Sequence, residues 1–361
     1  MRRIPLQNIY YLLCYAWDMV EMRGKVSTGI DDCSSLSNLL VHVLLNATDD
    51  LLKHGLAQGY TVYSSEVYGI NGKIDVGETL KQGRYRQGRM FCQYDELNSD
   101  ILINQIIYST LMDSVNNKSL SIENKNRISR TLRRMPQTRR ITITDHAFSL
   151  VKIHRNNRYY HFALNVCKLL HQSALPNKNV DGEHVFSDIV DDEHLMNRIF
   201  EKFLINFYKQ ECKKDFPVVS RSHIRFQLTP YGVTFTKSTD EAYALLPLME
   251  TDVTLYNPQT KKKIILDAKY YKDTLVSRYG QNGKIRREHL SQILSYVMNQ
   301  ENEEQPYTKE TKGILIYPTV DTEIDVSYTY KNTSHVIRVS TVNLNQDWSN
   351  IESRLKDIIC T

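Results

Sequence analysis

The sequence predicts an α/β protein in which helices flank a mixed β-sheet. Its C-terminal half runs helix, β-hairpin, helix, strand, strand, helix, which is the element order of an α/β domain. The 361 residues are enough for two domains, each with its own core. A polar stretch over 175–192 contains Pro, Asn and Gly and is the predicted boundary. We therefore expect an N-terminal α+β domain over 1–180 and a C-terminal domain over 181–361.

Hydrophobic residues make up 41% of the chain and charged residues 24%, as in ordinary globular proteins. The formal net charge of +5 is compatible with nucleic-acid binding without requiring it. The six cysteines stand singly, with no C-x-x-C pair, which argues against a zinc site and indicates reduced thiols in the cytoplasm. There is no apolar run of 18 residues, so no membrane span is predicted.

The N-terminal half begins with an apolar, tyrosine-rich segment at 1–17, which we interpret as a helix packed into the fold. Further helices are expected where apolar residues recur every three or four positions, and one strand where they alternate. The predicted helices are 35–56, 100–115 and 159–173, and the predicted strand is 61–67.

Two basic stretches lie in this half. Residues 81–89 include Arg84 and Arg86 between glycines, and residues 127–140 hold six arginines, among them Arg133 and Arg134. Such stretches contact phosphates or an acidic partner in some proteins, and in others they are solvated or pair with acidic neighbours. The sequence leaves both interpretations open.

The C-terminal half is organised around two runs, Glu250–Tyr256 and Lys263–Tyr270. The first alternates as a half-buried strand, and the second begins with Ile-Ile-Leu, as a covered strand does. An Asn-Pro turn separates them, so they are expected to pair as a hairpin. Helices are predicted at 193–212, 288–300 and 347–359, and strands at 313–317 and 336–344.

The hairpin carries the candidate catalytic residues. Asp267 and Lys269 are two apart and point to one side of their strand, and pairing brings Asp252 beside them. Two carboxylates can bind Mg²⁺, and a nearby lysine can orient a water molecule or stabilise negative charge. The plainer interpretation is a surface hairpin with a salt bridge. Charges that directly follow a buried strand need partners or a metal ion, which favours a site.

Motifs along nearly the whole chain resemble the McrC subunits of McrBC restriction systems, which act on modified cytosine. The motifs are the segments 4–18, 72–76, 94–98, 158–160, 166–168, 249–252, 267–272, 314–318 and 341–344. The resemblance implies a restriction-endonuclease-like C-terminal domain of the PD-(D/E)xK superfamily. Asp252 and Asp267 would then bind Mg²⁺, and Lys269 would assist catalysis.

The resemblance also suggests supporting residues. In this nuclease fold a helical glutamate preceding the hairpin often joins the metal site, and here it would be Glu201. A helix carrying Gln292 and Tyr296 would lie behind the site. Thr251 stands where the superfamily pattern has proline, and Glu250, on the same face as Asp252, is a candidate additional ligand.

The resemblance further implies an McrB-type hexameric AAA+ GTPase as partner, which recognises methylated DNA and binds and hydrolyses GTP. The chain itself contains no P-loop motif. The N-terminal domain would contact the partner's ring and stimulate its GTPase, and the C-terminal domain would cleave DNA as a type IV restriction endonuclease subunit. An alternative is a regulatory adaptor that activates the motor without cleaving DNA. We find no cofactor fingerprint that would indicate a small-molecule enzyme.

Overall fold

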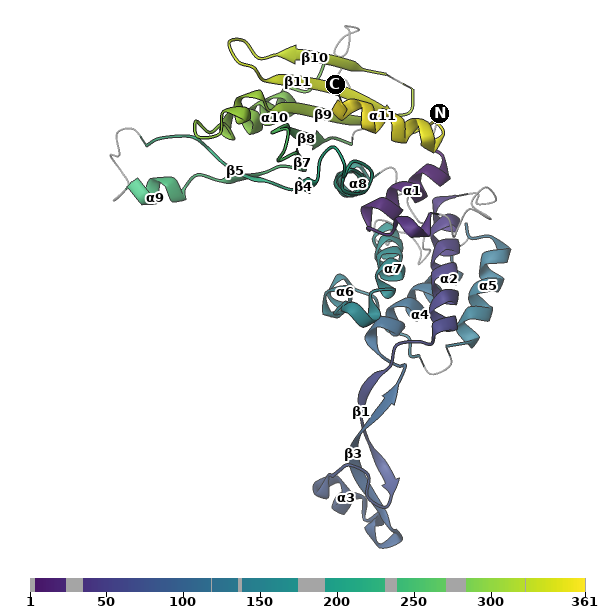
Figure 1. The fold of residues 1–361 in the computed structure, drawn as a ribbon. Helices are drawn as coiled ribbons and strands as arrows, with labels where there is room; N and C mark the ends of the chain where they lie inside the picture. The colour runs from purple at the N-terminus through teal and green to yellow at the C-terminus, as the bar shows by residue number, and fades with distance from the viewer. Residues whose placement is uncertain are drawn as a thin grey trace. The chain divides into compact units, whose positions relative to one another are not determined.

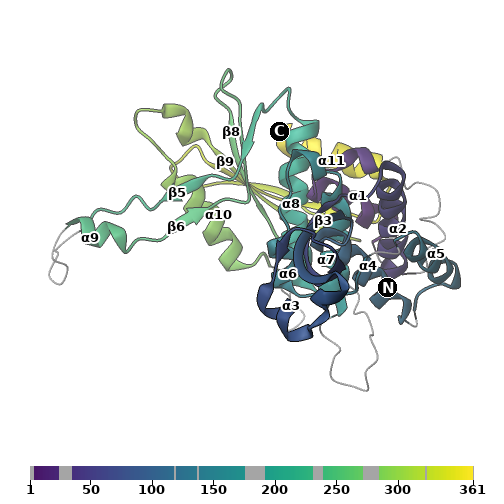
Figure 2. The ribbon, with the colours of Figure 1, turned by 90° about the horizontal axis from the view of Figure 1, so that it is seen from below.

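The computed structural model describes residues 4–23, 35–117, 119–135, 138–174, 192–230, 239–270, 284–321 and 323–360. The chain forms two compact units (Figures 1 and 2). The sheet unit contains residues 1–31 and 189–361, and the helical unit contains residues 32–188.

The first helix, α1 (Leu6–Ala16), belongs to the sheet unit, whereas the sequence analysis placed it in the N-terminal domain. The Asn8 side chain donates hydrogen bonds of 2.8 Å to the carbonyl oxygens of Leu344 and Gln346. This helix therefore packs against residues from the other end of the chain, and the predicted division at 180/181 is wrong for residues 1–31. The boundary at 175–192 lies, except for residue 192, outside the described residues.

The sheet unit is built on a six-stranded sheet with the order β10-β11-β9-β8-β7-β4. β8 and β11 lie on either side of β9 and both run parallel to it. The other neighbouring pairs in this sheet are antiparallel. The strands are β4 (Val218–Ser220), β7 (Val253–Tyr256), β8 (Lys263–Ala268), β9 (Lys312–Thr319), β10 (Asp325–Thr329) and β11 (Val336–Asn343). The predicted mixed sheet is confirmed.

Helices cover both faces of this sheet. Ile337 and Val339 on β11 join the core beneath α10 (Arg287–Asn299). Arg338, between them, points to the opposite face and donates to the carbonyl of Ile358 in α11 (Trp348–Cys360). The long helix α8 (Glu193–Glu211) lies on the α11 side, because the Tyr208 hydroxyl donates to the Leu355 carbonyl.

A two-stranded arm extends the sheet unit. Its strands are β5 (His223–Arg225) and β6 (Leu248–Glu250), and the short helix α9 (Thr239–Ala244) lies between them in sequence. The sequence analysis did not predict β4, β5 or β10. The first two have three residues each, too few to establish a periodic pattern.

The helical unit contains three of the predicted helices, α2 (Leu36–His54), α4 (Leu102–Val115) and α7 (Tyr160–Ala174), with ends that differ from prediction by a few residues. It also contains α5 (Ile122–Arg133), which overlaps the basic stretch at 127–140, and the short helix α6 (Asp145–Leu150), which the sequence analysis did not predict. The apolar stripe predicted for α2 is buried, and the Ser35 side chain caps its first turn by accepting from the Asn38 amide. None of the helices in the described part of the chain is long and apolar enough to cross a membrane.

A long antiparallel hairpin projects from these helices (Figure 1). β1 (Gly59–Tyr68) pairs along its whole length with β3 (Arg89–Asn98), and β2 (Lys73–Ile74) adds a short third strand. Helix α3 (Val76–Gln82) and the 3₁₀ turn η2 (Arg84–Gln87) lie at the hairpin's far end. Gly72 has φ +73°, and a Cβ there would lie 2.3 Å from the carbonyl oxygen of Gln93, so the turn requires glycine.

Candidate active site

The structure brings the two predicted carboxylates together. Val253 of β7 pairs with Leu266 of β8, which places Asp252 opposite the end of β8 where Asp267 lies. Oδ2 of Asp252 accepts a 2.8 Å hydrogen bond from the backbone N–H of Ala268. The hairpin register therefore positions one carboxylate directly, and a backbone hydrogen bond holds it there.

The strand leading into this site differs from the prediction in two ways. The expected single strand over 250–256 is broken at Thr251 and Asp252, between β6 and β7. Thr251 donates its N–H to the Ser222 carbonyl, and its hydroxyl accepts from the Ser222 N–H. This local pairing marks where the chain passes from the arm to the sheet. The first three residues of β7 are also buried on both faces rather than on one, since Thr254 is only 3% exposed between flanking strands.

Lys269 lies beside Asp267, as the spacing predicts. Its Nζ is 2.8 Å from Oδ2 of Asp267, and its backbone N–H donates to the Ile316 carbonyl on β9. The lysine therefore continues the ladder beyond the end of β8, with its side chain directed toward the carboxylate. Asp267 is 0% exposed and the Lys269 side chain 14%, so this ion pair is almost completely removed from water.

Burial dominates the electrostatics of the carboxylates. It raises the pKa of Asp267 to about 7, with Lys269 opposing the rise and Asp252 adding to it. Burial also raises the pKa of Asp252, although the Ala268 N–H and Lys269 work against the shift. Two neighbouring buried carboxylates with raised pKa values form a site that favours an added positive charge.

The predicted helix residues stand behind the lysine. Nζ of Lys269 donates to Oε1 of Gln292 at 3.0 Å, and Nε2 of Gln292 donates to the Tyr296 hydroxyl at 2.7 Å. That hydroxyl donates to the Glu250 carbonyl oxygen at 2.8 Å. A continuous chain of hydrogen bonds thus fixes Lys269 between α10 and the end of β6, and it joins two of the supporting candidates, Gln292 and Tyr296.

Glu201 and Glu250 are near the carboxylates but face an arginine that the sequence analysis did not identify. Nη2 of Arg221 lies 3.2 Å from Oε2 of Glu201, and Nη1 lies 3.7 Å from Oε1 of Glu250. Burial, followed by the charge of Asp252, raises the pKa of Glu201, and Arg221 partly reverses the rise. The only signal in the sequence is an arginine one residue after two valines, in Val-Val-Ser-Arg, which is too common to single out.

A divalent ion fits the chemistry of this site. Both oxygens of Asp267 are buried, and within the described residues the Lys269 ammonium, 2.8 Å from Oδ2, is the cation beside them. Among the residues that the structure describes, no three His, Cys, Asp or Glu side chains form a ready metal cluster. Mg²⁺ is commonly held by one or two carboxylates, with water and phosphate filling its other positions, so Asp252 and Asp267 suffice.

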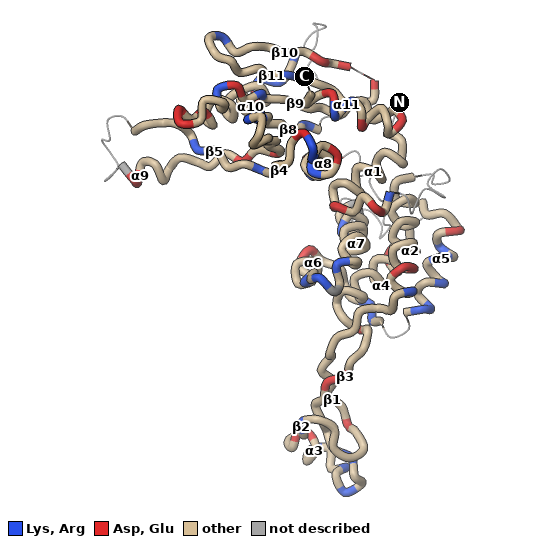
Figure 3. Tube along the Cα trace, in the orientation of Figure 1, with Lys and Arg blue, Asp and Glu red and all other residues tan. Residues whose placement is uncertain are grey.

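The basic candidates belong to the helical unit (Figure 3). All four side chains are exposed, and two of them form ion pairs: Arg84 pairs with Glu66 at 3.2 Å and Arg134 with Asp49 at 2.7 Å. These ion pairs favour the interpretation that Arg84 and Arg134 pair with acidic neighbours within the fold. For Arg86 and Arg133, solvent exposure and contact with a phosphate or an acidic partner both stay open.

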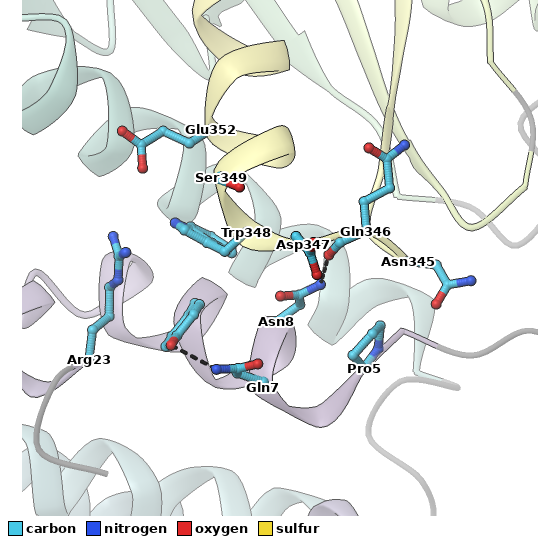
Figure 4. Close-up of a pocket in the computed structure, with 11 residues that line it drawn as sticks. Pro5, Gln7, Asn8, Arg23, Asn345, Gln346, Asp347, Trp348, Ser349 and Glu352 are labelled. Atoms are coloured by element: carbon cyan, nitrogen blue, oxygen red, sulfur yellow. Dashed lines mark hydrogen bonds between the residues drawn. The ribbon is translucent and has the colours of Figure 1, made fainter. Parts of the chain in front are cut away.

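A cavity of about 470 Å³ lies between α1 and the start of α11 (Figure 4). It is lined by Gln7, Tyr11 and Trp348 among others, and the Arg23 guanidinium lies 4.9 Å from the centre of the Tyr11 ring. None of the candidate catalytic residues lines it. The cavity is therefore separate from the carboxylate site.

The fold and the site together define a class: an α/β protein whose mixed sheet carries two carboxylates and a lysine at the ends of adjacent strands. Sequence comparison then gives the family. The chain belongs to the family described as McrBC 5-methylcytosine restriction system component, whose family model matches residues 7–318.

Two relatives illustrate this membership. The chain is 31% identical over 355 residues to the type IV methyl-directed restriction enzyme EcoKMcrBC of Escherichia coli strain K12, covering 98% of this chain and 97% of that protein. It also resembles a chain from the structure of Thermococcus gammatolerans McrB AAA+ hexamers with bound McrC. That match has a TM-score of 0.53 and 14% identity, and it covers 98% of this chain and 76% of the other, so it supports the fold alone.

Proposed function

We propose that this chain is the nuclease subunit of a GTP-dependent restriction complex and cleaves DNA containing methylated cytosine. The observation that carries the proposal is the meeting of Asp252, Asp267 and Lys269 at the ends of β7 and β8, with Asp267 completely buried. A surface salt bridge would not need a carboxylate that is completely removed from water. The proposed fold class is that of the PD-(D/E)xK nucleases.

The proposed chemistry is hydrolysis of a phosphodiester by in-line attack of water. Mg²⁺ would be held by Asp252 and Asp267, and it would supply Lewis-acid activation and charge neutralisation. The Ala268 N–H holds Asp252 in place through Oδ2, and the carboxylate would bind the ion from this fixed position. Lys269, fixed by Gln292, would orient the attacking water or stabilise charge that develops on the phosphate.

We further propose that the helical unit binds an McrB-type AAA+ GTPase hexamer and stimulates its GTP hydrolysis. The hairpin supports this assignment because it exposes large apolar side chains that a free surface would not favour. Tyr60 is 75% exposed, Tyr68 83% and Ile70 66%. Recognition of the methylated base would then belong to the partner, and the complex would act in the cytoplasm.

The experiment that tests the nuclease assignment compares wild-type protein with Asp267→Ala in a mixture with the partner. Methylated plasmid, Mg²⁺ and GTP are present, and cleavage and GTP hydrolysis are both measured. We expect the variant to lose cleavage and keep GTPase stimulation. Unchanged cleavage would refute the site, and loss of both activities would show that Asp267 maintains the fold.

The alternative function, a regulatory adaptor, makes a different prediction in the same experiment. Wild-type protein would raise GTP hydrolysis without any cleavage of methylated DNA. The buried and electrostatically strained position of Asp267 argues against this alternative, since an idle site would be more stable with a neutral residue there.

A further inference from the structure

Arg221 occupies a fixed position at the rim of the carboxylate site. It follows β4, whose Ser220 pairs with Thr254 of β7, and it precedes Ser222, whose backbone pairs with Thr251. The backbone is thus held on both sides of the arginine. The side chain is 36% exposed, so its guanidinium reaches the surface of the site, whereas Lys269 lies almost entirely beneath it.

The guanidinium spans two carboxylates from different elements. It contacts Glu201 of α8 at 3.2 Å and Glu250 of β6 at 3.7 Å. Oε1 of Glu201 also accepts a 2.6 Å hydrogen bond from Asn197, whose own side-chain oxygen accepts from the Tyr270 N–H. Glu201 is therefore tied to the segment directly after Lys269, and it is close enough to Asp252 and Asp267 to affect the ionisation of both.

We infer that Arg221 is an exchangeable counter-ion: it holds Glu201 and Glu250 in the metal-free protein and moves to the DNA phosphate when a divalent cation binds. The inference rests on the proposed nuclease function. It adds a phosphate-binding residue and a reason why Glu201 does not already form a metal cluster with Asp252 and Asp267.

The exchange follows from the ligand preferences of the two cations. A hard divalent ion binds carboxylate oxygens more strongly than a half-exposed guanidinium does, because exposed ion pairs contribute little. Guanidinium, in turn, matches the geometry of phosphate oxygens and can form two parallel hydrogen bonds with them. Arg221 lies on the exposed side of the site, where a DNA backbone would approach, so its release requires rotation of the side chain and no change in the fold.

The exchange predicts opposite effects of one substitution on two measurements. Arg221→Gln removes the competitor for the carboxylates, so the full chain should bind Mn²⁺ about twofold to fivefold more tightly, the range expected for an exposed ion pair. Binding is measured by loss of the free Mn²⁺ signal in electron paramagnetic resonance. In the reconstituted complex with Mg²⁺ and GTP, the same variant should cleave methylated DNA at least about tenfold more slowly, since a charge-assisted phosphate contact is lost.

Two further variants separate this role from a structural one. Arg225→Gln removes an exposed arginine from the adjacent strand β5 and should leave Mn²⁺ affinity unchanged. Arg221→Lys keeps the charge but cannot span both glutamates, and it should fall between wild type and Arg221→Gln in both measurements. A purely structural arginine would weaken metal binding, or leave it unchanged, when replaced.

The outcomes also distinguish failure of the inference from failure of the proposed function. If wild-type protein binds Mn²⁺ in a manner that Asp267→Ala abolishes, but Arg221→Gln binds it no more tightly, the exchange is refuted and the nuclease site stands. If Asp267→Ala leaves Mn²⁺ binding unchanged, the metal site itself is wrong, and the inference falls with it.

Discussion

The backbone N–H of Ala268 donates a 2.8 Å hydrogen bond to Oδ2 of Asp252, which ties the start of β7 to the end of β8. This bond crosses the hairpin at the point where both carboxylates project. Asp252 consequently has a structural role in addition to its proposed role as a metal ligand.

The two roles of Asp252 can be separated by substitution. Asp252→Asn retains an oxygen that accepts from Ala268 and removes a buried carboxylate of raised pKa, so its stability should be at or above that of wild type while cleavage is lost. Asp252→Ala leaves the buried N–H without its acceptor and should also lower the free energy of unfolding by about 1–2 kcal/mol. Urea denaturation and plasmid cleavage measure the two effects. Cleavage by the Asn variant at the wild-type rate would contradict the assignment.

Asp267 should destabilise the metal-free protein at neutral pH. Its folded pKa of about 7 lies above the unfolded value of about 4, so the folded state loses stability as pH rises between these values. In EDTA, Asp267→Asn should therefore have a higher Tm than wild type at pH 8, by several degrees, and the difference should vanish near pH 4. Thermal melts at both pH values test this.

Added Mg²⁺ supplies the control for this prediction. It should raise the Tm of wild-type protein, because the ion binds the folded state, and have little effect on Asp267→Asn. A metal-free Asn variant that melts below wild type at pH 8 would mean that the Lys269 ion pair outweighs the burial of the carboxylate.

The part of the site that could be predicted is the part encoded in adjacent residues. Asp267 and Lys269 stand out because they directly follow a buried apolar run, and the turn before that run brings in Asp252. Arg221 could not be predicted, because its position depends on pairing between Ser222 and Thr251, 29 residues apart. Local patterns carry no information on such pairing.

The same limit applies to the fold. The helical pattern of α1 and the burial of its apolar side follow from spacing alone. Its assignment to the sheet unit depends on Asn8 reaching Leu344, a separation of 336 residues. Periodicity identifies an element and its buried face, whereas the unit that covers the face is decided by tertiary packing.

Gln292 is expected to position Lys269 rather than to touch DNA. Gln292→Leu removes the acceptor for the Lys269 ammonium, so the lysine should lose its fixed orientation and cleavage should fall about tenfold or more. GTPase stimulation should be unchanged. Ser291→Ala, at an exposed position on the same helix, is the matched control. An equal loss in both variants would indicate disturbance of α10 instead.

His289 should make the protein sensitive to mild acid. It is 5% exposed and hydrogen-bonded to Tyr317, and burial, aided by Lys269 and Arg286, lowers its pKa to about 4. The unfolded value is near 6.5, so the neutral histidine's contribution is complete above that pH and is lost as pH falls toward 4.

The measurement is the difference in urea midpoint between wild type and His289→Gln at pH 7.5 and pH 5. Asp267 acts in the opposite direction over this range, and the difference between the two proteins cancels its effect. Wild type should lose more stability than the variant on going to pH 5. Parallel losses would show that His289 has the same pKa in the folded and unfolded states, which would contradict the prediction.

The exposed apolar residues of the β1–β3 hairpin provide the test of partner binding. Tyr68 and Ile70 are 83% and 66% exposed, so replacing both with serine should not affect folding. If the hairpin contacts the AAA+ partner, the double variant should lose most GTPase stimulation and should no longer migrate with the partner on size exclusion. Ile122→Ser on α5, which is 79% exposed in the same unit, is the control. Loss of stimulation in the control alone would move the contact surface from the hairpin to α5.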